Sequence, residues 1–551
     1  MIVNSAVQES SLSISTVAVE QQRILAAIDI GTNSIHMVVV QIDPALPTFT
    51  IIAREKETVR LGDRDPETGN LTPEAIKRAI AALQRCQELA KTFNAEQVVA
   101  VATSAVREAP NGRDFLKQIN SELGLFVNLI SGQEEARRIY LGVLSGMEFN
   151  NHPHIIIDIG GGSTELILGD SHESRSLSST RVGAVRLTAE FVTTDPISNS
   201  ELQYLQAYVR GTLERAIEEL RVHLKAGEQP RLVGTSGTIE TLATIHAREK
   251  LGIVPNPLNG YELSRKDIKE MLKRLASMSA TERAAIPGMS DRRSEIIVAG
   301  VVILLEAMTL LGAESLIIGE RALREGVIVD WMLSHNLIED RLRYQESVRQ
   351  RSILKLAQKY QVNLEYSDRV ANFAFSLFNQ TKGYLHDWDT EEQELLWAAA
   401  ILHNCGLYVN HSAYHKHSYY LIRNGELLGF TEAGIEVIAN LARYHRRSTP
   451  KKKHENYSNL PSKKHRQLVN QISAILRLAV TLDRRQIGAI QQVRCEYHPD
   501  VRELHLHLQP SQLDDDCALE LWSLDYEKGV FEEEYGVNVV ATLEAALEVV
   551  S

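Results

Sequence analysis

A short pattern that occurs twice constrains the fold of this chain more than any other feature. Residues 24–42 and 155–168 each hold an apolar run, then Ile-Asp-Ile-Gly, a short polar turn and a second apolar run. Apolar runs on either side of such a turn predict two β-strands joined by a tight loop. Two copies about 130 residues apart favour a duplicated phosphate-binding fold over two unrelated hairpins.

The polar turns have the composition of an anion site. Glycine lets several backbone N–H groups point at one anion, and Ser and Thr hydroxyls add donors. The Asp before each turn, Asp29 or Asp158, can hold a cation directly or through water. We therefore predict that two facing hairpins bind phosphate together with Mg²⁺. The predicted phosphate-binding residues are Gly31, Thr32, Asn33 and Ser34 in the first turn and Gly160, Gly161, Gly162, Ser163 and Thr164 in the second.

Two other strand ends carry polar residues. Residues 97–108 predict a buried strand that runs into a helix, with Thr103 and Arg107 at the carboxyl end, where open α/β sheets bind ligands. Arg107 can pair with a phosphate there, and an ordinary surface arginine is the alternative. Residues 230–240 predict a third phosphate-binding loop at the start of a helix, formed by Gly234, Ser236, Gly237 and Thr238.

Glu134 and Glu135 follow a Ser-Gly turn at the start of a predicted helix. Acidic residues in a first helical turn are usually surface charges that interact favourably with the helix dipole. The position of this pair just before the second phosphate hairpin favours a functional role instead.

Composition and charge narrow the class of protein. The chain has 551 residues, enough for three or four domains, and 44% of them are hydrophobic, as in soluble globular proteins. The net charge of −12 argues against a general nucleic-acid binder. Four scattered cysteines fit a reducing compartment better than a disulfide frame or a zinc site. The sequence contains no run of about 18 apolar residues, which a membrane-spanning helix would need. We therefore expect a cytoplasmic protein without a membrane partner.

The composition and the spacing of apolar residues change along the chain and predict five segments. Residues 1–22 lack a signal-peptide pattern and predict a disordered tail. Residues 23–145 and 146–327 each predict an α/β domain built around one hairpin. Residues 328–487 predict long amphipathic helices, and residues 488–551 return to alternating strands in a small α+β domain.

Basic residues gather between positions 443 and 466, where Glu455 is the single acidic residue. A solvated loop would explain such a run. In an acidic protein, the run is equally well placed to attract a long polyanion toward the predicted phosphate site between the hairpins. We favour a polyphosphate path and expect salt-sensitive binding of long chains. The path residues are Arg446, Arg447, Lys451, Lys452 and Lys453.

Four motifs in the same order resemble the exopolyphosphatase / guanosine pentaphosphate phosphohydrolase family of the actin–hexokinase–Hsp70 (ASKHA) superfamily. They are residues 27–34, 130–137, 158–165 and 234–238, and the match extends to Leu323-Arg324-Glu325-Gly326, Leu402-His403 and residues 444–447. The resemblance implies two actin-like (ribonuclease-H-like) α/β domains with the active site between them. It also implies an all-α domain related to the HD phosphohydrolases, a small C-terminal α+β domain and a homodimer.

The resemblance also implies roles for the carboxylates. By position, Glu135 corresponds to the catalytic base, with Glu134 as its nearest rival. Asp158 and Glu165 correspond to further catalytic carboxylates, and Asp29, Asp158 and Glu165 to the groups around Mg²⁺, with other divalent ions and K⁺ as alternatives. Hydrolysis of a phosphoanhydride needs charge neutralisation and an oriented water, which these residue types supply.

The sequence departs from the family pattern at two places, one in the helical domain and one in the loop at residues 319–321. The helical domain reads His403-Asn404 where metal phosphohydrolases carry His-Asp, and Tyr366-Ser367-Asp368 where a histidine is expected. We therefore expect no second metal site there. Gly319-Glu320-Arg321 replaces the more common Ser-Asp-Gly, which puts a nucleotide contact by this loop in doubt.

The leading hypothesis is Mg²⁺-dependent release of terminal orthophosphate from inorganic polyphosphate. The close alternative is hydrolysis of guanosine pentaphosphate to the tetraphosphate by the same water attack. Phosphotransfer, as in sugar kinases, is disfavoured because those enzymes lack the Ser-Gly-x-Glu-Glu-Ala element. A non-enzymatic sensor of polyphosphate or of guanosine tetra- or pentaphosphate is disfavoured because all cleft carboxylates are present.

Overall fold

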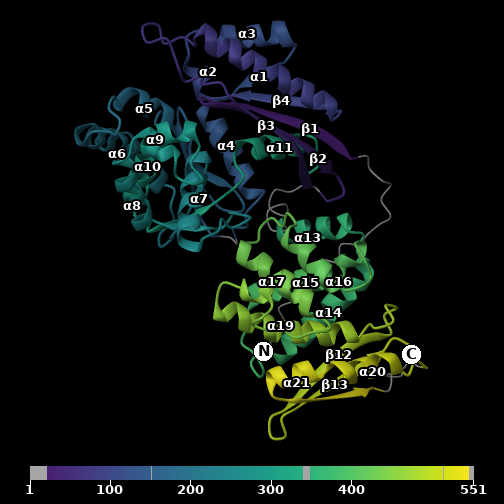
Figure 1. Ribbon diagram of the computed structural model, residues 1–551. Coiled ribbons are helices and arrows are strands. Elements are labelled where there is room, and N and C mark those ends of the chain that lie inside the picture. The colour runs from purple at the N-terminus through teal and green to yellow at the C-terminus, as the bar shows by residue number, and fades with distance from the viewer. Residues whose placement is uncertain (1–21, 47, 150–151, 339–347, 513, 545–551) are drawn as a thin grey trace.

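The computed structural model describes residues 22–46, 48–149, 152–338, 348–512 and 514–544. Two α/β domains lie side by side, and a helical domain with the C-terminal strands at its far end lies below them (Figure 1). The predicted tail, apart from Gln22, lies outside the described residues.

The first domain is built on a five-stranded sheet of order β3-β2-β1-β4-β5. Strands β1 to β3 are antiparallel neighbours, and β4 and β5 run parallel to β1. The strands are β1 (Arg23–Ile30), β2 (Ser34–Asp43), β3 (Thr48–Thr58), β4 (Gln97–Ala102) and β5 (Val127–Leu129). The helices are α1 (Pro73–Thr92), α2 (Ser104–Glu108), α3 (Gly112–Leu123) and α4 (Gly132–Leu144).

The second domain repeats this topology. Its sheet has the order β10-β11-β9-β6-β7-β8, with β6 to β8 antiparallel, β9 and β11 parallel to β6, and β10 added at the edge. The strands are β6 (His154–Ile159), β7 (Thr164–Gly169), β8 (Ser174–Thr180), β9 (Arg231–Thr235), β10 (Glu262–Ser264) and β11 (Ser315–Ile318). The helices are α5 (Ala184–Phe191), α6 (Asn199–Arg221), α7 (Gly237–Leu251), α8 (Arg265–Ala276), α9 (Ala280–Ala284) and α10 (Asp291–Leu311). The repeated strand order confirms the duplicated α/β fold.

Helix α10 is the one described helix that is long and apolar enough to cross a membrane by length and composition. Most of its side chains are buried, and residues from Ile297 to Met308 belong to the core of the second domain. Its apolar composition is therefore explained by its place in the fold.

Helices α4 and α11 (Leu323–Ser334) lie between the two sheets. One core cluster joins apolar side chains of both helices with Leu25 and Val38 of the first sheet and Ile156 and Ile167 of the second. The predicted boundary at residue 327 falls inside α11, which packs mainly on α4 and also contacts β1. The helix thus returns the chain to the first domain because its apolar face completes that shared core.

The helical domain and the C-terminal strands share a single core. The helices are α13 (Val348–Lys359), α14 (Leu364–Thr381), α15 (Thr390–Leu402), a 3₁₀ turn (Cys405–Tyr408), α16 (Tyr414–Arg423), α17 (Glu432–Tyr444), α18 (Glu455–Ser458) and α19 (Lys463–Thr481). The C-terminal elements are β12 (Ile490–His498), β13 (Glu503–Pro510), α20 (Ala518–Glu527), α21 (Gly529–Tyr535) and β14 (Asn538–Leu543). Alternate residues Leu504, Leu506 and Leu508 pack into this core, so the C-terminal part closes the helical domain rather than forming a core of its own.

Candidate active site

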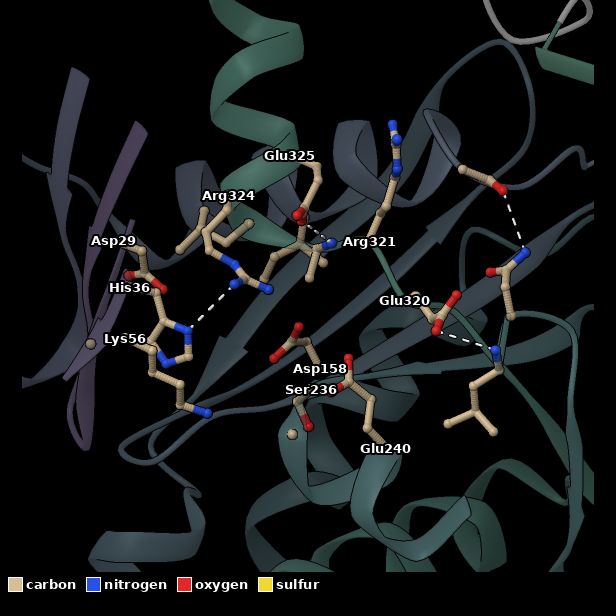
Figure 2. A pocket seen from close by; sticks show the side chains of 18 of the residues that line it. Asp29, His36, Lys56, Asp158, Ser236, Glu240, Glu320, Arg321, Arg324 and Glu325 are labelled. Atoms are coloured by element: carbon tan, nitrogen blue, oxygen red, sulfur yellow. Dashed lines mark hydrogen bonds between the residues drawn. The ribbon is translucent and has the colours of Figure 1, made fainter. Parts of the chain in front are cut away.

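A cavity of about 1030 Å³ lies where the three parts of the chain meet. Both hairpin turns line it, together with the starts of α7, α10 and α11. Figure 2 shows Asp29 and Asp158 near the two turns, and Ser236 and Arg324 at the starts of α7 and α11. Residues 423–430 of the helical domain add a further wall. The cavity is therefore lined by three domains, whereas the sequence predicts a site between two.

The two hairpin turns are built alike and touch each other. The Gly31 N–H donates to the Ser34 carbonyl at 3.1 Å, and the Gly160 N–H donates to the Ser163 carbonyl at 2.9 Å. A Cβ atom on Gly162 would lie 2.8 Å from Thr32 Oγ1. Only a residue without a side chain lets the second turn approach the first so closely, and the two turns face one another as the repeated pattern predicts.

Four of the carboxylates that line the cavity come from the two hairpins and the start of α4. Asp29 and Asp158 are the penultimate residues of β1 and β6. Asp158 pairs across its hairpin with Glu165, whereas Asp29 pairs with His36. The fourth carboxylate, Glu135, lies in the first turn of α4 and is 7% exposed. The duplicated hairpin thus carries two acids in one copy and an acid with a histidine in the other.

Among the described residues, three of these four carboxylates hydrogen-bond to a polar side chain, and Asp29 does not. Thr235 Oγ1 donates to Asp158 Oδ2 at 2.6 Å, and Ser179 Oγ donates to Glu165 Oε1 at 2.7 Å. Arg107 Nη1 donates to Glu135 Oε2 at 3.0 Å. In the part of the chain that the structure describes, Asp29 Oδ1 is buried without a hydrogen-bond partner, so it is the carboxylate oxygen in greatest need of a ligand.

Burial raises the pKa of all four acids, and repulsion from neighbouring carboxylates adds to the effect at Asp29, Glu135 and Glu165. Burial raises the pKa of Asp29 to about 7, and the charges of Asp158 and Glu325 add to the effect while Arg324 opposes it. Burial also raises the pKa of Glu135 to about 7, against the charge of Arg107. The pKa of Asp158 is raised by burial, and that of Glu165 is raised well above its usual range. Such a cluster attracts a cation or a proton at neutral pH.

The donor set fits a hard cation held loosely. Among the described residues, no group of three or more His, Cys, Asp or Glu side chains is placed to hold a metal by itself. Asp29, Asp158 and Glu165 therefore form no closed three-ligand cage. Mg²⁺ typically takes one or two carboxylates and completes its shell with water and substrate phosphate. The partnerless Asp29 oxygen and the acidic cluster fit that mode.

Most predicted phosphate-binding residues line the cavity. They are Gly31, Thr32, Asn33, Ser34, Thr103, Gly160, Gly161, Gly162, Ser163, Ser236 and Gly237. Ser236 has φ of +95°, and its buried Oγ finds no hydrogen-bond partner among the described residues. A strained residue with an unused donor at the start of α7 is typical of a ligand-binding position.

Four predicted residues are not among the lining residues. Gly234 lies inside β9, and a Cβ there would meet Leu316 Cδ1 at 2.2 Å, so this glycine serves packing. Thr164 Oγ1 donates to the Val182 carbonyl at 2.5 Å. Thr238 Oγ1 accepts from Arg293 at 3.3 Å.

The fourth, Arg107, reaches the cavity only through another side chain. Its Nη1 donates to the Ile130 carbonyl and to Glu135. The geometry therefore places Arg107 beside the candidate base, where it orients the Glu135 carboxylate.

Several cavity residues carry no signal in the hairpin motifs. His36 and Lys56 are cross-strand neighbours on β2 and β3, Arg293 comes from α10 and Arg324 from α11. Burial and the neighbouring cations lower the pKa of His36 to about 3 and also lower that of Lys56. Positive charge that is crowded and desolvated in this way indicates an anion site. His36 lies in the second apolar run of the first hairpin and Arg324 in the Leu323–Gly326 motif, whereas Lys56 and Arg293 belong to no motif noted in the sequence.

The predicted polyphosphate path lies on the helical domain and contributes no lining residue. Arg446 stacks over Tyr414 with its guanidinium carbon 4.8 Å from the ring centre. Lys451, Lys452 and Lys453 are exposed. Burial and the charges of Arg446, Arg443, Lys416 and Arg447 lower the pKa of His415 to about 4. The basic residues thus gather in space as well as in sequence.

The His403-Asn404 position is buried in the helical domain. The imidazole Nδ1 of His403 donates to the Ala400 carbonyl at 2.7 Å, and burial lowers the pKa of this histidine to about 4. His403 and His445 rings lie 5.0 Å apart. Within the described part of the chain no metal-binding group forms here.

Comparison with known proteins assigns the family. The model of the Ppx/GppA phosphatase family matches residues 38–335, and that of Ppx/GppA phosphatase, domain III, matches residues 348–528. The chain is 31% identical over 490 residues to the guanosine-5'-triphosphate,3'-diphosphate pyrophosphatase of Aliivibrio fischeri strain MJ11, covering 87% of this chain and 91% of the relative. A protein of the same name from Vibrio parahaemolyticus is 30% identical over 474 residues, covering 85% and 88%.

The chain is also similar to a solved structure. An exopolyphosphatase from Cytophaga hutchinsonii is 27% identical, with a TM-score of 0.52, over 58% of this chain and 100% of that one. The family match spans more than half of the chain, and the sequence likeness to the curated relatives extends over most of it. The chain therefore belongs to the Ppx/GppA phosphatase family.

Proposed function

We propose that this protein hydrolyses the terminal phosphoanhydride bond of guanosine 5'-triphosphate 3'-diphosphate. The observation that carries hydrolysis is the position of Glu135, a buried carboxylate with a pKa of about 7 that faces the touching phosphate hairpins. The choice of substrate follows the relatives named for this nucleotide, at 31% and 30% identity. The basic run favours inorganic polyphosphate from sequence alone, whereas the relatives favour the nucleotide.

The geometry gives each group a task. Backbone N–H groups and hydroxyls of the two turns bind the terminal phosphates. Glu135, held by Arg107 at 3.0 Å, accepts a proton from the attacking water as the bond from phosphorus to the bridging oxygen breaks. The products are orthophosphate and the shortened nucleotide.

We also propose that Mg²⁺ is held by Asp29 and Asp158, with Glu165 close to them. The ion would neutralise charge on the phosphate oxygens. The support for these residues is the partnerless Asp29 oxygen and the raised pKa values of the acids.

Inorganic polyphosphate is the second candidate substrate. The observation that favours it is the cluster of Arg443, Arg446, Arg447 and Lys416 around His415. Several cations on one surface attract a long polyanion more than a single nucleotide.

Phosphate release by the purified full chain with Mg²⁺ separates the two substrates. We expect a higher kcat/KM for guanosine pentaphosphate than for long-chain polyphosphate. Faster turnover of polyphosphate, with strong salt dependence that is lost in a Lys451→Ala, Lys452→Ala, Lys453→Ala variant, would establish the second candidate instead. No release from either substrate would contradict hydrolysis and favour a sensor.

A further inference from the structure

Arg324 lies between the acids and the cations of the cavity. It is the second residue of α11, and its Nη1 lies 3.4 Å from His36 Nδ1. Its side chain extends toward His36 on one side and the space beside Asp158 on the other (Figure 2). Its charge acts on Asp29, Asp158 and Glu240 alike. Arg324 therefore faces the acids of both hairpins at once.

Several other arginines near the cavity are already engaged. Arg107 is paired with Glu135, and Arg321 donates to Ser145 and Glu426. Arg293 donates to Thr238. In the described part of the chain, Arg324 forms no ion pair within 4 Å with a carboxylate. Apart from the contact of Nη1 with His36, its donors remain available for a ligand among the described residues.

The two helices that carry Glu135 and Arg324 are locked together. Helices α4 and α11 cross at Gly142 and Gly326. A Cβ on Gly142 would lie 1.9 Å from the Ala322 carbonyl oxygen, and one on Gly326 would lie 1.7 Å from the Arg138 carbonyl oxygen. Backbones in such close contact cannot slide or separate without loss of packing. The base and the arginine are thus held at a fixed separation.

We propose that Arg324 contacts the phosphoryl group that is transferred and stabilises the charge that develops on it. A guanidinium offers paired N–H donors that match phosphate oxygens. The inference rests on the proposed phosphoanhydride hydrolysis. In that step the water oxygen bonds to phosphorus, its proton passes to Glu135 and the bridging oxygen leaves with the bond electrons. Arg324 forms no covalent bond and gives up no proton.

Arginines in this role contribute about 10³–10⁵-fold to kcat in phosphoryl transfer. We expect Arg324→Ala to lower kcat roughly 10³-fold with a smaller change in KM, and Arg324→Lys to recover part of the loss. The matched control is Arg215→Ala, because Arg215 lies on α6 with an 88% exposed side chain. Circular dichroism and thermal melts of all three variants check that the fold is retained.

A pH profile separates direct contact from an effect through Asp29. Arg324 opposes the rise in the pKa of Asp29, so its removal raises that pKa further. If Arg324 acts only by keeping Asp29 ionised, the loss in Arg324→Ala disappears at pH 9. We expect the loss to persist there. Recovery at pH 9, or a kcat within threefold of wild type, would overturn the inference. A wild-type protein that releases no phosphate would overturn both this inference and the proposed function.

Discussion

Two adjacent glutamates show how one position in a helix decides chemistry. Glu134 accepts from Arg137 at 2.7 Å and from Arg138 at 2.8 Å, and these hydrogen bonds lower its pKa. Glu135 points the other way, into the cavity, where burial raises its pKa to about 7. Successive helical residues lie about 100° apart around the axis, so neighbours in sequence face different surroundings.

The raised pKa of Glu135 predicts a change in stability with pH. In the folded protein the pKa is about 7, and its usual value is 4.5. Between these values the folded state keeps a proton that the unfolded state has lost, so the free energy of unfolding falls as pH rises, by roughly 3 kcal/mol at most. Glu135→Gln lacks this titration. The Tm of the variant minus that of wild type should increase from pH 5 to pH 8 without divalent metal. A difference that stays constant or shrinks would contradict the buried position of Glu135.

At the scale of elements, glycines set how closely segments approach. Gly162 lets the second hairpin turn contact Thr32 and Ser104 of the first domain. Gly211, in the middle of α6, has no described atom within 4 Å of the site a Cβ would occupy. The same substitution therefore has opposite consequences at the two positions.

We expect Gly162→Ala to lower kcat/KM at least tenfold, because its Cβ would lie 2.6 Å from Ser104 Oγ and push the turns apart. The matched control Gly211→Ala should keep full activity and stabilise the protein by about 0.5–1 kcal/mol, since alanine favours a helix over glycine. Phosphate release and chemical denaturation measure both effects. Full activity of Gly162→Ala would show that the contact between the turns is dispensable.

At the scale of the whole molecule, polar contacts hold the helical domain against the two α/β domains beside the cavity. Arg321 packs over Phe49 of the first domain, with its guanidinium carbon 4.5 Å from the ring centre, and pairs with Glu426 at 3.4 Å. Lys355 donates to the Phe49 carbonyl at 2.9 Å, and Arg423 donates to the Asn256 carbonyl at 3.0 Å. Interfaces made of such contacts permit domain motion more readily than apolar ones.

Arg321→Ala removes a contact that spans two domains and the loop before α11. We expect faster hydrogen exchange in residues 423–430. We also expect the free energy of unfolding to fall by about 1–3 kcal/mol, the usual effect of breaking a buried hydrogen bond to a charged group. Exchange in β6, in the centre of the second sheet, should not change. Unaltered exchange in residues 423–430 would mean that other contacts hold the helical domain in place.

The sequence predicts much of this architecture because its signals are local. The hairpin pattern gives β1, β2, β6 and β7, and capping residues fix helix starts, as where Thr72 accepts from the Ala75 N–H at the start of α1. The cluster of His36, Lys56, Arg293 and Arg324 could not be predicted in this way. These residues come from four elements that only tertiary packing brings together.

The glycines of the third loop show a second limit. Gly234 and Gly237 fit one phosphate-binding pattern, but Gly234 packs inside a strand and only Gly237 lines the cavity. A motif names residue types, and the fold decides which of them face the ligand. Likewise, the shared core of the helical domain and the C-terminal strands depends on contacts between distant segments.

The most direct test of the account compares Glu135→Gln with Glu134→Gln in initial rates of phosphate release from guanosine pentaphosphate with Mg²⁺. The two substitutions are chemically identical and adjacent. We predict that Glu135→Gln loses roughly 10²–10⁴-fold in kcat, as expected for removal of a general base, whereas Glu134→Gln stays within a few-fold of wild type. A large loss in Glu134→Gln together with an active Glu135→Gln would contradict the assignment of the base and with it the mechanism built on this cavity.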